Sequence, residues 1–91
     1  MRLMTSMSQV LKALANPRRL AILQSLRQHR QASVIELSHV LKLSFRSTSK
    51  HLQVLSQQGL VEPERAGMQV DYHLGKKLPR RVRKLLMLIF E

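Results

Sequence analysis

Apolar residues recur at helical spacing near both ends of the chain. Before Pro17, and again after Pro79, they fall at steps of three and four, which places them on one stripe of a helix. The first stripe consists of Leu3, Met7, Val10 and Leu14, and the last consists of Val82, Leu85, Leu86 and Ile89. The pattern therefore predicts an amphipathic helix at each end.

A second helix is predicted from Pro17 to about Arg30. Asn16 is a favoured N-cap, and proline is tolerated at the first helical position because no helical partner is needed for its missing N–H. Arg18 and Arg19 in the first turn oppose the helix dipole. We therefore expect another group to compensate their charge.

Two more helices follow, joined by a very short turn. Ser33-Val34-Ile35-Glu36 has the form of a capping box and starts a short third helix that buries Leu37 and either Val40 or Leu41. Ser44 gives the next start signal only three residues after Leu41. This spacing predicts a helix-turn-helix.

The fourth helix is predicted from Phe45 to Gln58, ending at Gly59, a residue suited to a left-handed helix end. One face carries Thr48, Leu52 and Leu55. The first two turns contain basic and hydroxyl residues and no acid. That composition favours contact with a polyanion over an ordinary solvated surface, which normally mixes charges.

After Gly59 the apolar period changes from helical to alternating. Leu60 to Arg65 is predicted to form one strand, Ala66-Gly67 the turn, and the following residues the partner strand. The residues expected on its half-buried face are Met68, Val70, Tyr72 and Leu74. Pro63 cannot donate a ladder hydrogen bond, so its strand must be an edge or leave that side unpaired.

The predicted fold is mainly α with a small antiparallel β-hairpin, in the order of four helices, two strands and one helix. A helix-turn-helix followed by a hairpin is a winged helix. No internal repeat or flexible linker interrupts the 91 residues. We therefore expect a single domain over residues 1–91.

Charge narrows the function. Sixteen Lys and Arg stand against five Asp and Glu, a net charge of +11, which indicates a polyanionic partner. Aromatic residues make up only 3%, which disfavours stacking of single-stranded bases.

The chain has no cysteine and no catalytic constellation, so we expect no enzyme activity. Its longest apolar run, Leu85 to Phe90, is too short to span a bilayer, and we expect a cytoplasmic, nucleoid-associated protein.

Six of the sixteen basic residues lie between Lys76 and Lys84. Removing them leaves 10 − 5 = +5 for the rest of the chain. Three interpretations stay open for this cluster: phosphate contacts, made above all by Lys76, Lys77 and Arg80; solvation of an apolar helix; or contact with an anionic membrane surface. The first two are favoured, and no membrane partner is expected.

Three segments of the chain resemble the ArsR/SmtB family of winged helix-turn-helix repressors. The matching stretches cover about residues 10 to 75 and are Leu11 to Leu23, with Ala15-Asn16-Pro17-Arg18-Arg19; Leu43-Ser44 with Ser49 to Leu55; and Gly59-Leu60-Val61 with Gly67, Val70, Tyr72 and Leu74. The resemblance implies a transcriptional repressor that binds a palindromic operator in double-stranded DNA. It also implies that the 45–58 helix enters the major groove and that the hairpin lies along the minor groove.

The resemblance further implies a homodimer formed by the first and last helices, whose apolar stripes a small core cannot fully cover. The expected interface residues are Leu3, Met7, Val10, Val82, Leu85, Leu86 and Ile89, and Met4 and Met87 are interpreted as packing residues of the same surface.

The DNA-contact candidates are the polar and basic residues at the start of the fourth helix and beside the hairpin turn. They are Ser44, Phe45, Arg46, Ser47, Ser49, Lys50, Arg65 and Gln69. Arg and Lys pair with guanine, and hydroxyls reach bases or phosphates. Phe45 either touches a thymine methyl group or folds inward, and both alternatives are kept. His51 is interpreted as a packing histidine.

The metal-binding motifs of the family are not matched. Its paired-cysteine segment falls on Ser33-Val34-Ile35, and Asp71-Tyr72-His73 lacks the later ligands, since Lys84 stands eleven residues beyond His73. We therefore expect no metal and no cofactor. The inducer is unknown: an organic ligand, a partner protein or no ligand are all open. Lys42 stands where the family often has glycine, which predicts a residue near positive φ.

Two other functions stay open. The charge could serve a nonspecific DNA-coating protein without base readout, or the winged helix could serve protein contacts alone. Preference for particular DNA sequences distinguishes the first, and an exposed apolar patch away from the terminal helices indicates the second.

Overall fold

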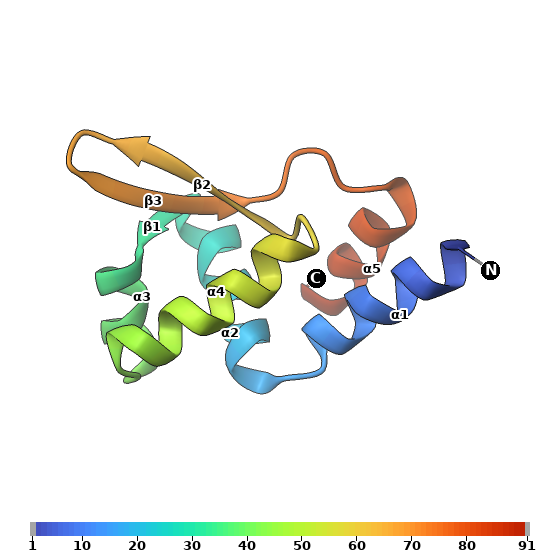
Figure 1. Ribbon diagram of the computed structural model, residues 1–91, viewed down its shortest axis with the longest axis horizontal. Coiled ribbons are helices and arrows are strands. Elements are labelled where there is room, and N and C mark those ends of the chain that lie inside the picture. Colours follow the sequence, from blue (N-terminus) through green and yellow to red (C-terminus); the bar gives the residue numbers. More distant parts are fainter. Residues whose placement is uncertain (1, 91) are drawn as a thin grey trace.

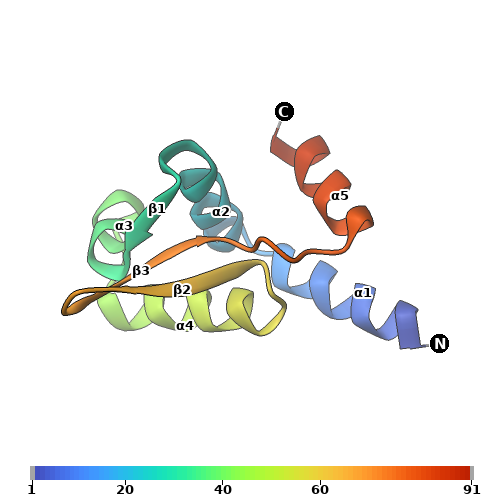
Figure 2. The same ribbon diagram turned by 90° about the horizontal axis from the view of Figure 1, so that it is seen from above.

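The computed structural model describes the backbone of residues 2–90 and the side chains of residues 6–90. Its elements in chain order are α1 (Arg2–Leu14), α2 (Pro17–His29), β1 (Gln31–Ser33), α3 (Val34–Leu41), α4 (Phe45–Gln57), β2 (Val61–Ala66), β3 (Gln69–Leu74) and α5 (Arg80–Phe90). Figures 1 and 2 show that α3, the start of α4 and the tip of the β2–β3 hairpin lie at one end of the molecule. Helices α1 and α5 lie at the other end.

The predicted order of helices and strands is confirmed, with one addition. The three residues of β1 pair antiparallel with β3, so the sheet has three strands in the order β1-β3-β2 and not the two strands of a simple hairpin. The edge position predicted for the strand with Pro63 is confirmed, because β2 pairs only with β3. A proline at this edge removes no hydrogen bond from the centre of the sheet.

The position of the hairpin turn corrects the prediction. Ala66 pairs with Gln69, so the two-residue loop is Gly67-Met68 and not Ala66-Gly67. Gly67 has φ of +67°, and glycine at the first loop position is typical of a type II′ turn. Met68 and Val70 were expected to be half-buried, but both are exposed, because the hairpin tip extends past the helices (Figure 2).

The helix-starting signals are confirmed by side-chain geometry. Asn16 Oδ1 accepts hydrogen bonds from the backbone N–H groups of Arg18 and Arg19 at 2.9 and 3.2 Å. At α3, Ser33 Oγ accepts from the Glu36 N–H, and the Ser33 N–H donates to Glu36 Oε1 at 2.8 Å. This backbone hydrogen bond lowers the pKa of the Glu36 carboxyl. The caps therefore fix where α2 and α3 begin.

The end of α4 is equally well defined. Gly59 has φ of +71°, its N–H donates to the Ser56 carbonyl, and the Leu60 N–H donates to the Leu55 carbonyl, both at 3.0 Å. This pair of bonds is the Schellman arrangement, which satisfies the last carbonyls of a helix. The chain then turns directly into β2.

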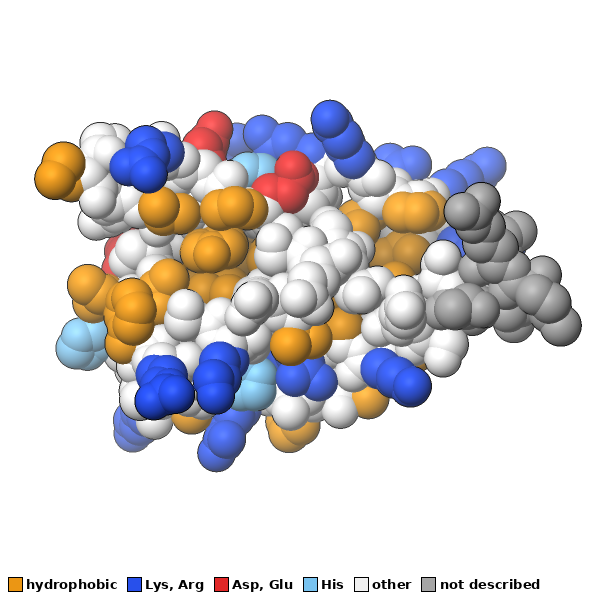
Figure 3. Space-filling model, viewed as in Figure 1, with side chains coloured by type: hydrophobic (Ala, Val, Ile, Leu, Met, Phe, Trp, Pro, Cys, Tyr) orange, Lys and Arg blue, Asp and Glu red, His pale blue; other side chains and the backbone are white. Residues whose placement is uncertain are grey.

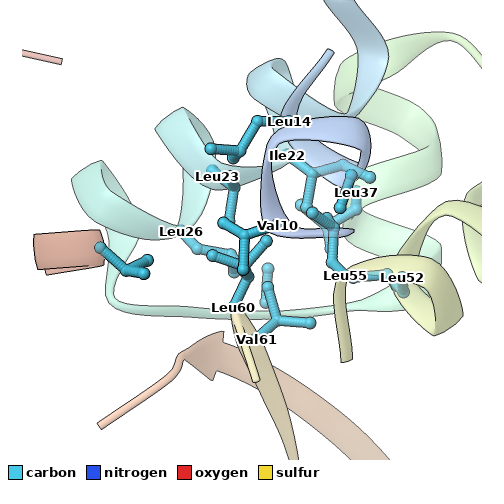
Figure 4. Packing of buried hydrophobic residues seen from close by; sticks show 13 residues of the cluster. Val10, Leu14, Ile22, Leu23, Leu26, Leu37, Leu52, Leu55, Leu60 and Val61 are labelled. Carbon is cyan, nitrogen blue, oxygen red and sulfur yellow. The ribbon is translucent and has the colours of Figure 1, made fainter. Parts of the chain in front are cut away.

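One hydrophobic core joins α2, α3, α4 and the base of the sheet (Figure 4). Ile22, Leu37, Leu52, Leu55 and Val61 are fully buried in it. Of the two alternatives for α3, the structure favours Leu41, which packs partly against the core, whereas Val40 is exposed. This core holds the helix-turn-helix and the wing in one rigid arrangement.

Candidate nucleic-acid interface

The start of α4 is anchored from its buried side. Ser44 is the N-cap, and its Oγ accepts a hydrogen bond from the Ser47 N–H at 3.0 Å. The Thr48 hydroxyl donates to the Ser44 carbonyl at 2.9 Å, and the Thr48 side chain is fully buried. The first turn of the helix is thus held by the exposed Ser44 cap and by Thr48, which faces the core.

The opposite side of the same turns faces solvent. Arg46 and Lys50 are exposed, Ser47 and Ser49 are half-buried, and Phe45 is 56% exposed, so the inward alternative for Phe45 is not observed. Helix α4 contains no acidic residue. In Figure 3, blue Lys and Arg side chains lie over the first turns of α4 at the lower left, and red acidic side chains lie mostly along the upper edge. The surface is therefore basic where a groove-binding helix needs it.

The turn before α4 has a residue in the left-handed region. Lys42 has φ of 55° and ψ of 44°, as the sequence predicts. Its neighbour Leu43 donates its N–H to the Ser38 carbonyl at 3.0 Å, which closes the end of α3. The tight turn sets α4 across α3, and both lie at the same end of the molecule (Figure 1).

The wing lies at that same end. Arg65 is exposed and pairs with Val70, one step from the loop, whereas the Gln69 amide donates to Asp71 Oδ1 at 2.8 Å. The predicted DNA contacts did not include Met68, which is fully exposed between Gly67 and Gln69. The register of the two strands would have identified Met68, because the pairing of Ala66 with Gln69 leaves Gly67 and Met68 at the tip of the wing.

The two faces of the sheet differ in charge. Because directly paired residues share a face, the register places Glu62, Glu64 and Asp71 together with His73 on the side opposite Val61, Tyr72 and Leu74. Glu62 also accepts a hydrogen bond from the Lys76 N–H at 2.7 Å. The acids that lie nearest to the wing thus point away from the face with Arg65.

The basic cluster of residues 76–84 is separate from the start of α4. All six of its Lys and Arg side chains are exposed. The connection from β3 to α5 and α5 itself lie at the end of the molecule opposite α3 in both ribbon views (Figures 1 and 2). The connection and α5 therefore do not join the surface formed by the start of α4 and the wing tip.

The predicted interface residues on the terminal helices fall into two groups. Val10 and Val82 are buried within the protomer, Val82 being only 2% exposed, so they hold the two helices to the core. Met7, Leu85 and Leu86 are partly buried against it, and Ile89 is exposed. The side chains of Leu3 and Met4 lie outside the described residues.

Three large apolar residues add to this surface. Leu11 on α1 and Met87 and Leu88 on α5 are exposed, the last two by 63% and 70%. Sequence reasoning singled out Met87 but missed Leu11 and Leu88, which lie off the two predicted stripes. The terminal helices thus expose more large apolar side chains than the two stripes indicate.

Two features, a group of metal ligands and a membrane-spanning helix, are absent from the described residues. Among them, no group of three or more His, Cys, Asp or Glu side chains is arranged to hold a metal ion. Within the same part of the chain, no helix combines the length and the apolar character needed to cross a membrane.

A capped helix-turn-helix followed by a two-stranded wing defines the winged helix-turn-helix class. A family model described as "Bacterial regulatory protein, arsR family" matches residues 16–63, from the N-cap of α2 into β2. The chain belongs to this family of regulators. The resemblance found in the sequence is thereby confirmed.

Known relatives agree in sequence and in structure. The repressor SmtB of Mycobacterium tuberculosis is 40% identical over 67 residues, which are 74% of this chain and 49% of SmtB. The activator HlyU of Vibrio cholerae is 40% identical over 77 residues, 85% of this chain and 70% of HlyU. A homodimeric winged helix-turn-helix DNA-binding domain of Mycobacterium bovis superposes with a TM-score of 0.83 at 33% identity, covering 97% of this chain and 78% of that domain. The chain spans about half the length of SmtB.

Proposed function

We propose that this chain is a sequence-specific regulator of transcription that binds double-stranded DNA as a homodimer and acts as a repressor. Helix α4 enters the major groove, where Arg46 and Lys50 contact base edges and Ser44, Phe45, Ser47 and Ser49 contact bases or the backbone. Arg65 and Gln69 approach the minor groove from the wing. Residues 1–91 act as one DNA-binding domain.

The observation that carries this proposal is the acid-free, solvent-facing start of α4, held by buried Thr48 within an arsR-family helix-turn-helix. A helix presented in this way reads base edges with its first turns. The Arg46 guanidinium offers paired donors for guanine, which a merely solvated face does not need. The wing supplies a second point of contact at the same end of the molecule.

The dimer is supported by the exposed apolar residues of the terminal helices. Ile89, Met87 and Leu88 on α5 and Leu11 on α1 leave an apolar surface that a partner copy covers. The Mycobacterium bovis relative is described as homodimeric. In a two-fold dimer, the reading helices address two half-sites about 34 Å apart.

Repression follows from occupying a promoter palindrome, and the relative SmtB is named a transcriptional repressor. The proposal places the protein in the cytoplasm on the nucleoid and gives it no catalytic role. Lys76, Lys77 and Arg80 add sequence-independent phosphate contacts, because all three are basic and exposed.

The test is a selection of bound duplexes from a randomised DNA pool, followed by footprinting of the recovered sequence. The proposal predicts a protected palindrome and an affinity that falls steeply with salt, because each phosphate contact releases counterions. Equal displacement of the recovered duplex by random DNA would instead establish the nonspecific coating protein. Binding of no DNA at moderate salt would leave protein contact as the function of the winged helix.

A further inference from the structure

The Arg19 guanidinium is shared by three helices. From the first turn of α2, its Nε donates to the Ala13 carbonyl of α1 at 2.6 Å, and its Nη2 donates to the Lys12 carbonyl at 3.3 Å. Its Nη1 lies 3.4 Å from Nδ1 of His51 on α4. The expected compensation of its charge is thus found, and the side chain connects the terminal helix to the helix proposed to read DNA.

The two carbonyls that Arg19 reaches lack a helical partner of their own. At the end of α1, the Leu11 carbonyl accepts from the Ala15 N–H and the Leu14 carbonyl accepts from the Asn16 N–H. Lys12 and Ala13 are the intervening carbonyls, and the negative end of the helix dipole favours a cation there. Arg19 therefore completes the C-terminal end of α1 while pointing its third nitrogen at α4.

His51 is suited to receive that third hydrogen bond through Nδ1. It is half-buried, and burial, followed by the nearby charges of Arg19 and Arg18, lowers the pKa of its imidazole. Both causes favour the neutral form of the ring. A neutral imidazole with its proton on Nε2 has Nδ1 available as an acceptor.

The remaining contacts of α4 with the body are mainly apolar. Leu52 and Leu55 pack into the core, and such contacts are not directional. A hydrogen bond to a fixed guanidinium fork is directional, and lysine cannot reproduce three donors in that geometry. The Arg19–His51 contact therefore adds a directional link between α1 and α4 to the apolar packing of the core.

We propose that Arg19, acting through His51, is a positioning residue that fixes the angle between α1 and α4 and thereby the separation of the two reading helices in the dimer. This step rests on the proposed function, because the separation matters only for a palindromic operator. Arg19 contacts no base in this proposal. Its effect is to make binding sensitive to half-site spacing.

The first test needs no DNA. The chain has no cysteine, so exposed Ser8 on α1 and Gln53 on α4 can be replaced by cysteine and spin-labelled, with labelled protein diluted into unlabelled protein. The proposal predicts a narrow distance distribution in the parent and broader distributions in Arg19→Lys and His51→Leu. His51→Gln restores the narrow distribution because its amide oxygen accepts from Arg19. Unchanged distributions in Arg19→Lys and His51→Leu would overturn the proposal.

The second test uses duplexes in which the recovered half-sites are moved apart or together by one base pair. Arg19→Lys and His51→Leu are expected to lose about tenfold in affinity for the best spacing and to discriminate less between spacings, with unchanged affinity for random DNA. His51→Leu removes the contact between Arg19 and α4 but keeps both hydrogen bonds of Arg19 to α1. It therefore tests the α4 contact even if Arg19→Lys folds poorly. Arg18→Lys is the matched control, since Arg18 bonds the Asn16 cap through its backbone N–H, which the substitution leaves in place.

The two proposals fail in different ways. Absence of any preferred duplex for the parent protein contradicts the proposed function, and the label distances still test the Arg19–His51 contact. A parent that prefers a palindrome, together with variants that keep its affinity and spacing profile, contradicts the positioning role alone.

Discussion

The end of the molecule that carries α3, α4 and the wing differs sharply from the end that carries α1 and α5. In the first, every helix start and end has a defined cap, and Leu37, Leu52 and Leu55 are fully buried within one protomer. In the second, Val82 is the one buried residue that α5 contributes among those described, and Met87 and Leu88 face solvent. The end with α3, α4 and the wing, which we propose reads DNA and call the reading end, is therefore complete in a single chain. The terminal helices present a surface suited to a second copy.

The largest expected effect comes from breaking the contact between the wing base and the end of α4. A Cβ added at Gly75 would lie 1.8 Å from the Gly59 carbonyl oxygen, so Gly75→Ala forces the wing base and the end of α4 apart. We expect a loss of about 3 kcal/mol or more in the free energy of unfolding, measured by urea denaturation.

Gly67→Ala is the control for Gly75→Ala. An added Cβ at Gly67 meets nothing within 4 Å, and only its φ of +67° opposes the change, at a cost of about 1 kcal/mol. Equal losses at the two glycines would show that backbone conformation, and not the close approach at Gly75, determines the effect.

The next prediction tests whether the terminal helices form the dimer interface. Met87→Glu places a charge on the apolar surface of α5 and should weaken dimerisation about 100-fold, or about 2.7 kcal/mol, without unfolding the protomer. Sedimentation equilibrium and circular dichroism measure the two properties. Gln24→Glu, an exposed position on α2, makes the same charge change and should leave the dimer intact. A Met87→Glu protein that stays dimeric at low concentration would exclude this surface as the interface.

The smallest effect concerns the turn of the reading end. Lys42 has φ of 55°, so Lys42→Gly should raise the free energy of unfolding by roughly 0.5 to 1 kcal/mol, since glycine adopts this conformation at no steric cost. Lys42→Ala keeps the strain and should change stability little. A stability gain in Lys42→Ala as large as in Lys42→Gly would contradict the explanation by strain.

The parts of the fold that were predicted from sequence are those encoded locally. Asn16-Pro17, the Ser33 capping box and Gly59 act within a few residues, so their positions along the chain define the helix boundaries. The absence of acidic residues at the start of α4 could also be predicted, because it concerns neighbouring residues in the sequence. Whether these residues contact DNA remains a prediction.

The parts that were missed depend on residues far apart in the chain. Strand β1 is three residues long and exists because β3 pairs with it. The exposure of Met68 and Val70 depends on how far the hairpin extends past the helices, which alternation alone does not specify. The Arg19–His51 contact joins residues 32 positions apart, and the sequence identified the uncompensated charge of Arg19 but not the partners that receive its hydrogen bonds.

The most direct test of the central claim compares one specific and one random duplex of equal length, by fluorescence anisotropy at a single ionic strength. Arg46→Ala should weaken binding to the selected palindrome by about tenfold or more, corresponding to roughly 1–3 kcal/mol, and leave the random duplex nearly unaffected. Lys76→Ala should weaken both alike. If Arg46→Ala also lowers both affinities equally, so that their ratio stays constant, α4 does not read sequence and the account is contradicted.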